Sequence, residues 1–264
     1  MVLKIIFMTS LTKEEIENYE KNGYLIKRQF YDSDEITKIR NWVYEYTEKK
    51  QEDWEAGKEM AYYETSKNDN SRVLSRVENF LQYHEGFKEL AESTRIKNCM
   101  EDLLKEPAVI FKEKINFKKP GGGGFRPHQD QGARWETFAK KFMSILICTD
   151  DCTIENGCLE VAPGFHKKGL LNEVDTPIPE KWTSQMNFIP FLSKVGDVVF
   201  FDGCTPHQSQ INNSEHSRTN IYLTYNGISE GEHRQEYLTR KRKELPPDNE
   251  RGSDYKDSPI HDWK

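Results

Sequence analysis

The chain has 264 residues, of which 35% are hydrophobic and 12% aromatic, enough for the core of one large domain. Its formal net charge of -6 argues against a nucleic-acid-binding protein, which would need a basic face. No stretch approaches the ~18 apolar residues of a membrane span. We therefore expect neither a nucleic acid nor a membrane among its partners.

The first eight residues are apolar except for one lysine and resemble the start of a signal peptide. The apolar run is too short, however, and a charged run at 13–15 follows it without a small-residue cleavage site. The five cysteines form no C-x-x-C pair, which fits reduced, buried thiols. We therefore expect a cytoplasmic protein, with Met1 or Met8 as its translation start.

The first 106 residues predict a mainly helical support. Residues 12–15 form a capping box for a helix that ends near Gly23, and residues 24–30 predict a short strand. A second helix is expected from Asp32, and an amphipathic pattern predicts a third over residues 87–104.

From Pro107 the pattern changes to short strand-like runs separated by turn residues. These runs cover residues 108–117, 142–149, 158–161, 198–202 and 219–226. Many short strands indicate a sandwich or jelly roll, so we expect a mainly β fold with flanking helices and a β core over residues 107–226.

A charged segment, residues 227–264, completes this single domain of 1–264. Within it, residues 234–243 predict a solvated helix face rather than a basic binding patch. The stretch 225–234 is a candidate lid over the site.

The sequence Pro127-His128-Gln129-Asp130 contains two candidate metal ligands. Residues i and i+2 of a strand point to the same side, so His128 and Asp130 can reach one ion. A glycine-rich turn, residues 121–124, comes just before them. One His-x-acid triplet is expected by chance in such a chain, so the assignment depends on a third ligand.

Two candidates exist for that third ligand, His166 and His207. Arg218 lies eleven residues after His207, and its planar guanidinium can bind a carboxylate through two hydrogen bonds. Ser209 can add a hydroxyl on the same side. We therefore favour His207. Two imidazoles and one carboxylate hold Fe(II) and leave positions free for a 2-oxo acid and O2.

In this order, these motifs resemble the phytanoyl-CoA dioxygenase family of Fe(II)- and 2-oxoglutarate-dependent oxygenases. The resemblance spans residues 11–226. The matching segments are 111–117, 127–130, 155–159 with 163–166, 196–197, and 207–209 with Arg218. It implies a double-stranded β-helix (a cupin-like jelly roll) with N-terminal helical support. It also implies a hydroxylase that converts 2-oxoglutarate to succinate and CO2.

The resemblance also implies roles for individual residues. His128, Asp130 and His207 correspond to the catalytic iron ligands. Arg218 and Ser209 correspond to residues that bind the distal carboxylate of 2-oxoglutarate, and Lys114 and Asn116 are assigned to the same co-substrate. Asp130 argues against the halogenating branch, in which a small residue replaces this carboxylate.

The lysine-rich strand indicates which kind of substrate to expect. Alternation places Lys112, Lys114, Asn116 and Lys118 on one face, which either meets an anionic ligand or faces water. We expect a small polar substrate, anionic or zwitterionic. Its candidate contacts, all just after the metal motif, are Gln131, Arg134 and Trp135.

Two other classes of protein remain as alternatives. One is a cupin-like metal-binding protein without oxygenase activity, which would not need Arg218 and Ser209. The other is a protein-modifying or oxygen-sensing oxygenase, for which the sequence shows no peptide-binding module.

Overall fold

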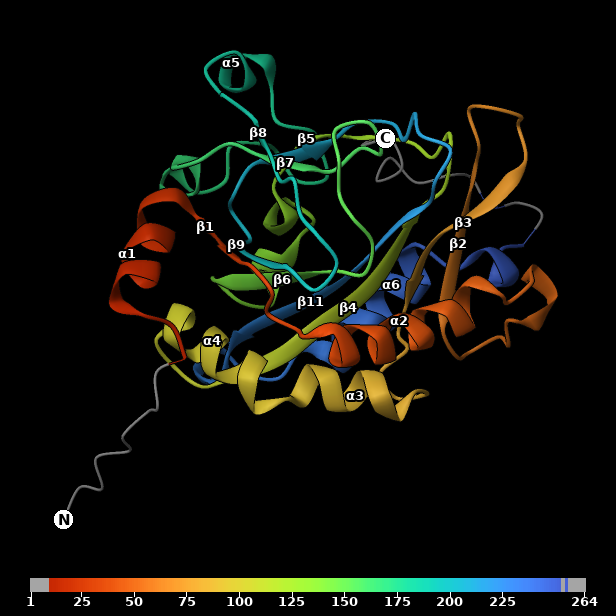
Figure 1. Cartoon of the computed structure of the whole chain (residues 1–264), viewed down its shortest axis with the longest axis horizontal. Coiled ribbons are helices and arrows are strands. Elements are labelled where there is room, and N and C mark those ends of the chain that lie inside the picture. The colour runs from red at the N-terminus through yellow and green to blue at the C-terminus, as the bar shows by residue number, and fades with distance from the viewer. Residues whose placement is uncertain (1–9, 253–254, 256–264) are drawn as a thin grey trace.

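Two antiparallel sheets form the centre of the molecule, seen here in a computed structural model that describes residues 10–252 and residue 255 (Figure 1). The possible starts at Met1 and Met8 lie outside these residues. In order, the large sheet contains β1 (Tyr24–Lys27), β9 (Val198–Asp202), β6 (Phe142–Cys148), β11 (Arg218–Gly227), β4 (Ala108–Lys118), β3 (Arg72–Glu78) and β2 (Met60–Thr65). The small sheet contains β5 (Phe125–His128), β10 (His207–Ser209), β7 (Leu159–Val161) and β8 (Ile189–Pro190). The predicted mainly β fold with a jelly-roll core is confirmed.

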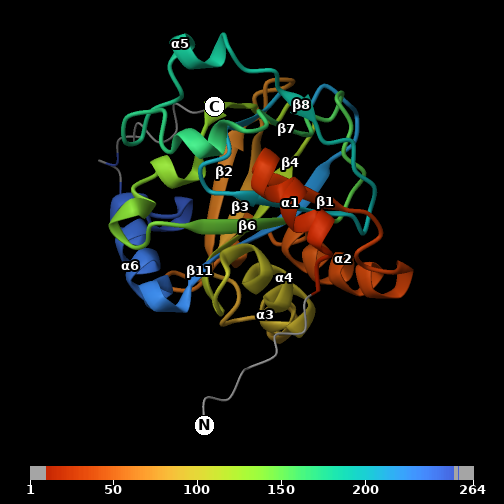
Figure 2. The ribbon, with the colours of Figure 1, turned by 90° about the vertical axis from the view of Figure 1, so that its left-hand side faces the viewer.

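Three helices before β4 cover the outer face of the large sheet: α2 (Ser33–Thr47), α3 (Glu85–Glu92) and α4 (Thr94–Leu104). The first helix, α1 (Lys13–Asn22), lies beside the edge strand β1. The predicted capping box at Thr12 is present, and α1 ends at Gly23 with a φ of 82°. The single helix predicted over residues 87–104 is instead two helices, because the chain turns at Ser93. Figure 2 shows α3 and α4 below the large sheet and α5 (Glu180–Thr183) above it.

The hairpin of β2 and β3 is an element of the N-terminal part that was not predicted, beside the four helices of the expected helical support. These strands extend the large sheet beyond β4, with Arg76 opposite Asn116 and Glu78 opposite Lys114. The alternation of apolar and polar residues did not reveal them, because the face that points into the molecule carries charged side chains. Arg76 and Glu78 are those inward residues.

The helix α6 (Arg234–Glu244) corrects the prediction of a solvated helix face for residues 234–243. It packs against β4 and buries Tyr237 and Leu238. Two of its cations pair with buried carboxylates of the sheet: Arg234 with Glu113, and Lys241 with Glu78. One face of α6 is therefore buried in the interior of the molecule.

The core has three parts. One lies between the helices and the large sheet and includes Ile115 and Phe117 of β4. A second lies between the two sheets and includes Val161. A third surrounds Trp135 and joins α6 to the sheet. Among the residues that the structure describes, no helix has the length and apolar character needed to span a bilayer.

Candidate active site

Strands β5 and β10 place two histidines side by side. His128 ends β5 and His207 begins β10, and the two are cross-strand partners with ring centroids 4.2 Å apart. Asp130 follows at the start of a short 3-10 helix. The three residues are buried, and one potential ligand atom from each lies within 4.8 Å of the other two.

Backbone carbonyl groups fix the orientation of both rings. Nδ1 of His128 lies 2.7 Å from the carbonyl oxygen of Arg126, and Nδ1 of His207 lies 2.9 Å from that of Thr205. A carbonyl oxygen only accepts hydrogen bonds, so each Nδ1 carries the hydrogen and each Nε2 keeps its lone pair. Burial lowers the pKa of both rings, that of His128 to about 3. Both imidazoles are therefore neutral near pH 7, as metal coordination requires.

Lys114 lies beside the third member of this cluster. Its Nζ is 3.8 Å from Oδ1 of Asp130 and 4.7 Å from the ring centroid of Tyr222. Burial alone would raise the pKa of Asp130, but Lys114 and the two imidazoles hold it below its ordinary value. Burial lowers the pKa of Lys114 to about 8. Two neutral imidazoles and one ionised carboxylate form a donor set that fits Fe(II).

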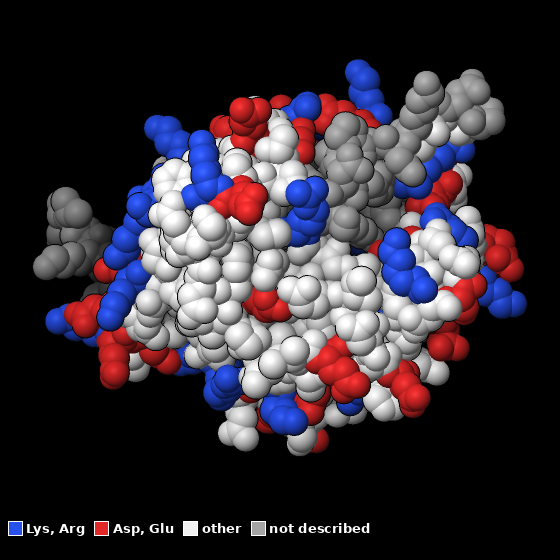
Figure 3. Space-filling model, turned by 90° about the horizontal axis from the view of Figure 1, so that it is seen from above, with Lys and Arg blue, Asp and Glu red and all other residues white. Residues whose placement is uncertain are grey.

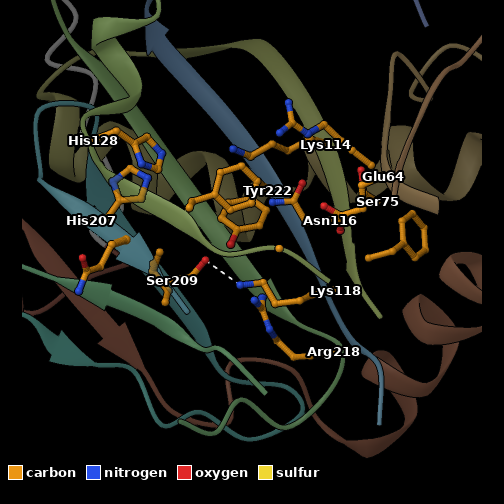
Figure 4. A pocket seen from close by; sticks show the side chains of 16 residues that line it. Glu64, Ser75, Lys114, Asn116, Lys118, His128, His207, Ser209, Arg218 and Tyr222 are labelled. Carbon is orange, nitrogen blue, oxygen red and sulfur yellow. Dashed lines mark hydrogen bonds between the residues drawn. The ribbon is translucent and has the colours of Figure 1, made fainter. Parts of the chain in front are cut away.

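Two cations meet at the other end of the same cavity. Arg218 and Lys118 are cross-strand partners of β11 and β4, and both are buried. Lys118 donates to Oγ of Ser209 at 2.7 Å (Figure 4). Arg218 donates to the carbonyl oxygen of Gly157 at 2.7 Å, and Lys118 donates to the same oxygen at 3.3 Å. This end of the cavity is built to receive a negative charge.

Two buried polar atoms of this cavity have no hydrogen-bond partner among the described residues. They are Oδ1 of Asn116 and Nε of Arg218. Buried polar atoms are nearly always paired, so such orphans indicate a missing ligand. The cavity, of about 50 Å³, is lined by both residues together with Lys118, Ser209, His128 and His207. A 2-oxo diacid between the histidines and Arg218 would fit this arrangement.

Sequence reasoning did not assign Lys118 to the co-substrate. Strand alternation placed it on the same face as Lys114 and Asn116, but the pattern left open whether that face meets water. The structure answers this question, because Lys112 and Lys118 are each only 5% exposed. The alternation in the sequence thus identified the face. The elements that cover it, the small sheet over Lys118 and α6 over Lys112, became known only from the structure.

A second cavity, of about 110 Å³, opens on the other side of the histidine and aspartate cluster. It shares Arg76, Lys114, Phe125 and His128 with the first cavity. Trp135, one of the predicted substrate contacts, lies in its wall and is buried. Five cations line this cavity: Arg76, Lys112, Lys114, Arg240 and Lys241.

The structure places the other two predicted substrate contacts elsewhere. Gln131 is buried and donates to the carbonyl oxygen of Lys140 at 2.6 Å. Arg134 is on the surface and pairs with Asp175 at 2.6 Å. Neither is among the residues that line the second cavity. The short helical turns after Asp130 direct these side chains away, so closeness in sequence to the metal motif was a poor guide.

His166 also lies apart from the cluster. Its ring centroid is 6.5 Å from that of Tyr19, and its Nδ1 is buried without a hydrogen-bond partner among the described residues. The ring packs closely against Gly23, where an added Cβ would lie 2.5 Å from Nδ1. His166 therefore supports the junction of α1 and β1, whereas His207 is the histidine beside His128.

Comparison with known proteins places these features in a family. The model of the family described as phytanoyl-CoA dioxygenase matches residues 19–220. The 2-aminoethylphosphonate dioxygenase of the uncultured bacterium HF130_AEPn_1 is 39% identical, over 94% of this chain and 95% of that protein. The methylphosphonate hydroxylase of Gimesia maris is 33% identical, over 89% of this chain and 88% of that protein.

Solved structures share the fold. EctD from S. alaskensis, crystallised with 2-oxoglutarate and 5-hydroxyectoine, has a TM-score of 0.73 and 19% identity, over 84% of this chain and 78% of that chain. The epimerase SnoN from nogalamycin biosynthesis has a TM-score of 0.67 and 19% identity, over 82% of this chain and 83% of that chain. By its sequence match, its fold and its motifs, the chain belongs to the phytanoyl-CoA dioxygenase family of Fe(II)- and 2-oxoglutarate-dependent oxygenases.

Proposed function

We propose that this enzyme hydroxylates a small organophosphonate, with conversion of 2-oxoglutarate and O2 to succinate and CO2. The observation that carries the proposal is the cation-lined cavity of about 110 Å³ beside His128 and Asp130. Its size suits a phosphonate with a few carbon atoms, and its charge suits an anion. The names of the two relatives described above point to the same class of compound.

In this proposal His128, Asp130 and His207 hold the iron, which supplies the activation of O2 when it is bound. The backbone carbonyls of Arg126 and Thr205 keep the two rings in the tautomer that can bind metal. Lys114 keeps Asp130 ionised by its positive charge. These contacts prepare the site before any ligand enters.

The first cavity orients the co-substrate. Arg218 and Lys118 would bind the distal carboxylate of 2-oxoglutarate, with Ser209 positioned by its hydrogen bond from Lys118. Charge-assisted hydrogen bonds of this kind are about twice as strong as neutral ones. The opposite, 2-oxo end of the molecule then points toward the two histidines, as the placement of the labelled side chains suggests (Figure 4).

The second cavity disfavours an acyl-CoA substrate. A volume of about 110 Å³ cannot enclose a CoA group or a long acyl chain. On the face shown in Figure 3, Lys and Arg side chains are interspersed with Asp and Glu, and uncharged residues lie between them. That face offers no extended basic patch for a polyanion.

We also infer a cytoplasmic location. All five cysteines, among them Cys148 and Cys152 with sulfur atoms 4.0 Å apart, are free thiols. Free thiols are typical of proteins kept in a reducing compartment.

The test is a substrate screen with the Fe(II)-reconstituted enzyme. Succinate release is measured with methylphosphonate, 2-aminoethylphosphonate, their carboxylate counterparts acetate and β-alanine, and an acyl-CoA. We expect release above background only with the phosphonates, together with a new ³¹P resonance from the hydroxylated product. Turnover confined to carboxylates or acyl-CoA would contradict the proposal. An Asp130→Ala variant, which removes one metal ligand, provides the inactive control.

A further inference from the structure

A cluster of buried charges lies under one wall of the second cavity. Its centre is the carboxylate of Glu78, which is fully buried. Lys241 of α6 donates to both carboxylate oxygens at 2.6 Å, and Arg76 lies 3.3 Å from Oε1. Glu78 thus ties α6 to β3 and holds two cations at fixed positions. Both cations line the cavity, whereas Glu78 does not.

Lys112 is the third cation of this wall, and it has no carboxylate of its own. Its side chain is 5% exposed, and its Nζ lies 5.0 Å from the ring centroid of Trp135 and 5.1 Å from that of Tyr237. Among the described residues the structure shows no hydrogen-bond acceptor for this ammonium group. The two rings stabilise the cation, and its ammonium group remains available to a ligand in the cavity that Lys112 lines.

The local charges do not balance. Arg76, Lys112 and Lys241 surround Glu78, which leaves two positive charges without a counterion. The other anions that line the cavity do not supply one. Asp130 faces Lys114 in the metal cluster, and Glu244 is an exposed residue at the end of α6. A buried excess of charge is costly unless an anion joins it.

Two β-bulges help to direct these side chains into the cavity. In β4, Lys112 pairs with Thr224 and Ile110 with Tyr225, which leaves Phe111 without a partner. In β3, Ser75 is left out of the pairing with β2 in the same way. Bulges next to active sites often redirect a neighbouring side chain. Here they lie beside Lys112 and Arg76.

We propose that Lys112, Arg76 and Lys241 form the subsite for the phosphonate group of the substrate, and that Lys112 is its main specificity determinant. A phosphonate has three oxygens and carries between one and two negative charges near neutral pH, whereas a carboxylate has two oxygens and carries one. It therefore matches the excess charge of the wall better than a carboxylate does. This inference rests on the proposed function and adds which residues recognise the substrate.

The decisive variant is Lys112→Met, which keeps the length of the side chain and removes its charge. Binding of methylphosphonate is measured by calorimetry on the Ni(II)- and 2-oxoglutarate-loaded protein, in which no turnover occurs. We expect the Kd for methylphosphonate to rise by about tenfold to hundredfold, the range for loss of a charge-assisted hydrogen bond. The preference for 2-aminoethylphosphonate over β-alanine should fall by a similar factor.

Four controls separate recognition from folding. The Kd for 2-oxoglutarate should stay within about twofold of the wild-type value, because Lys112 does not line the first cavity. The midpoint of thermal unfolding without ligand should not fall, since the variant removes a buried charge that has no acceptor. A Lys243→Met variant changes an exposed lysine of α6 and should bind methylphosphonate like the wild type. A Lys112→Arg variant should restore part of the affinity.

The outcomes distinguish the two proposals. If the wild type binds methylphosphonate and Lys112→Met binds it equally well, the subsite is wrong and the function stands. If the wild type neither binds nor converts any phosphonate, both are wrong. A parallel loss of 2-oxoglutarate binding in Lys112→Met would also contradict the inference, because it would indicate a general disturbance of the site.

Discussion

At the scale of single residues, the pairing of Arg218 with Lys118 shows what the candidate site requires. Two buried cations on neighbouring strands repel each other, and an anion between them or hydrogen-bond acceptors around them must offset this repulsion. Backbone and hydroxyl oxygens of Gly157 and Ser209 accept some of their hydrogen bonds. Nε of Arg218 still has no partner among the described residues. We therefore propose that a carboxylate of the co-substrate completes the pair.

This arrangement predicts a selective effect of Arg218→Ala. Loss of the guanidinium leaves the distal carboxylate of 2-oxoglutarate with one charged partner fewer, which costs ~2–5 kcal/mol of binding. The apparent affinity for 2-oxoglutarate, measured by succinate release over a range of co-substrate concentrations, should fall about thirtyfold or more. Lys119→Met, next to Lys118 but outside the first cavity, is the matched control. An unchanged dependence on 2-oxoglutarate in Arg218→Ala would place the carboxylate elsewhere.

The residue scale also shows why some assignments were possible from sequence and others were not. The order of His128, Asp130 and His207 along the chain, followed by Arg218, was enough to predict the three-residue cluster that the structure brings together. In contrast, the helical turns after Asp130 decide where the next residues point. Gln131, predicted to contact the substrate, therefore points toward the backbone of Lys140 and not into the second cavity.

At the scale of elements, β4 shows how much of a strand's environment its periodicity can predict. Its alternation correctly separated Ile115 and Phe117, which face the helices, from the lysines of the inner face. The bulge at Phe111 and the covering helix α6 involve contacts distant in sequence. The burial of β3 and of α6 was not predicted, for the same reason in each case. Their inward-facing residues include charged ones, whereas sequence patterns identify a buried face by its hydrophobic residues.

The ion cluster that joins these two elements predicts a large loss of stability in Glu78→Gln. Breaking a buried ion pair by removing one partner typically costs about 3–5 kcal/mol, because the remaining charges stay buried and uncompensated. The free energy of unfolding, measured by urea denaturation at pH 7, should fall by this amount. Glu236→Gln on the exposed side of α6 should change it by less than about 0.5 kcal/mol. A loss below about 1 kcal/mol in Glu78→Gln would mean that the cluster is not stabilising.

The loss of stability in Glu78→Gln should also depend on pH. Burial alone would raise the pKa of Glu78, but Lys241, Lys112 and Arg76 more than offset this and hold it well below its ordinary value of 4.5. A carboxyl group with a lowered pKa stabilises the folded state at pH values above its unfolded pKa. That contribution is lost as the pH falls below about 4.5. The difference in stability between wild type and Glu78→Gln should therefore shrink in acid.

At the scale of the whole molecule, the metal cluster joins parts of the chain that are far apart in sequence. His128 and His207 belong to the small sheet, whereas Lys114, which faces Asp130, belongs to the large sheet. Helices α2, α3 and α4 pack on the outer face of the large sheet and hold it in place. A metal ion at this point should therefore stabilise the folded chain as a whole.

Metal loading consequently provides a test of the ligand assignment that does not depend on turnover. Mn(II) at about one hundred times its Kd should stabilise the fold by about 2.7 kcal/mol, or roughly 5–10 °C in Tm. His207→Ala removes one of three ligands and should abolish most of this shift, measured by differential scanning fluorimetry with and without metal. His166→Ala should lower the Tm of the metal-free protein through its lost packing against Tyr19, yet keep the full metal-dependent shift. The reverse pattern, with the shift lost in His166→Ala and kept in His207→Ala, would overturn the assignment, because only a ligand can couple metal binding to folding.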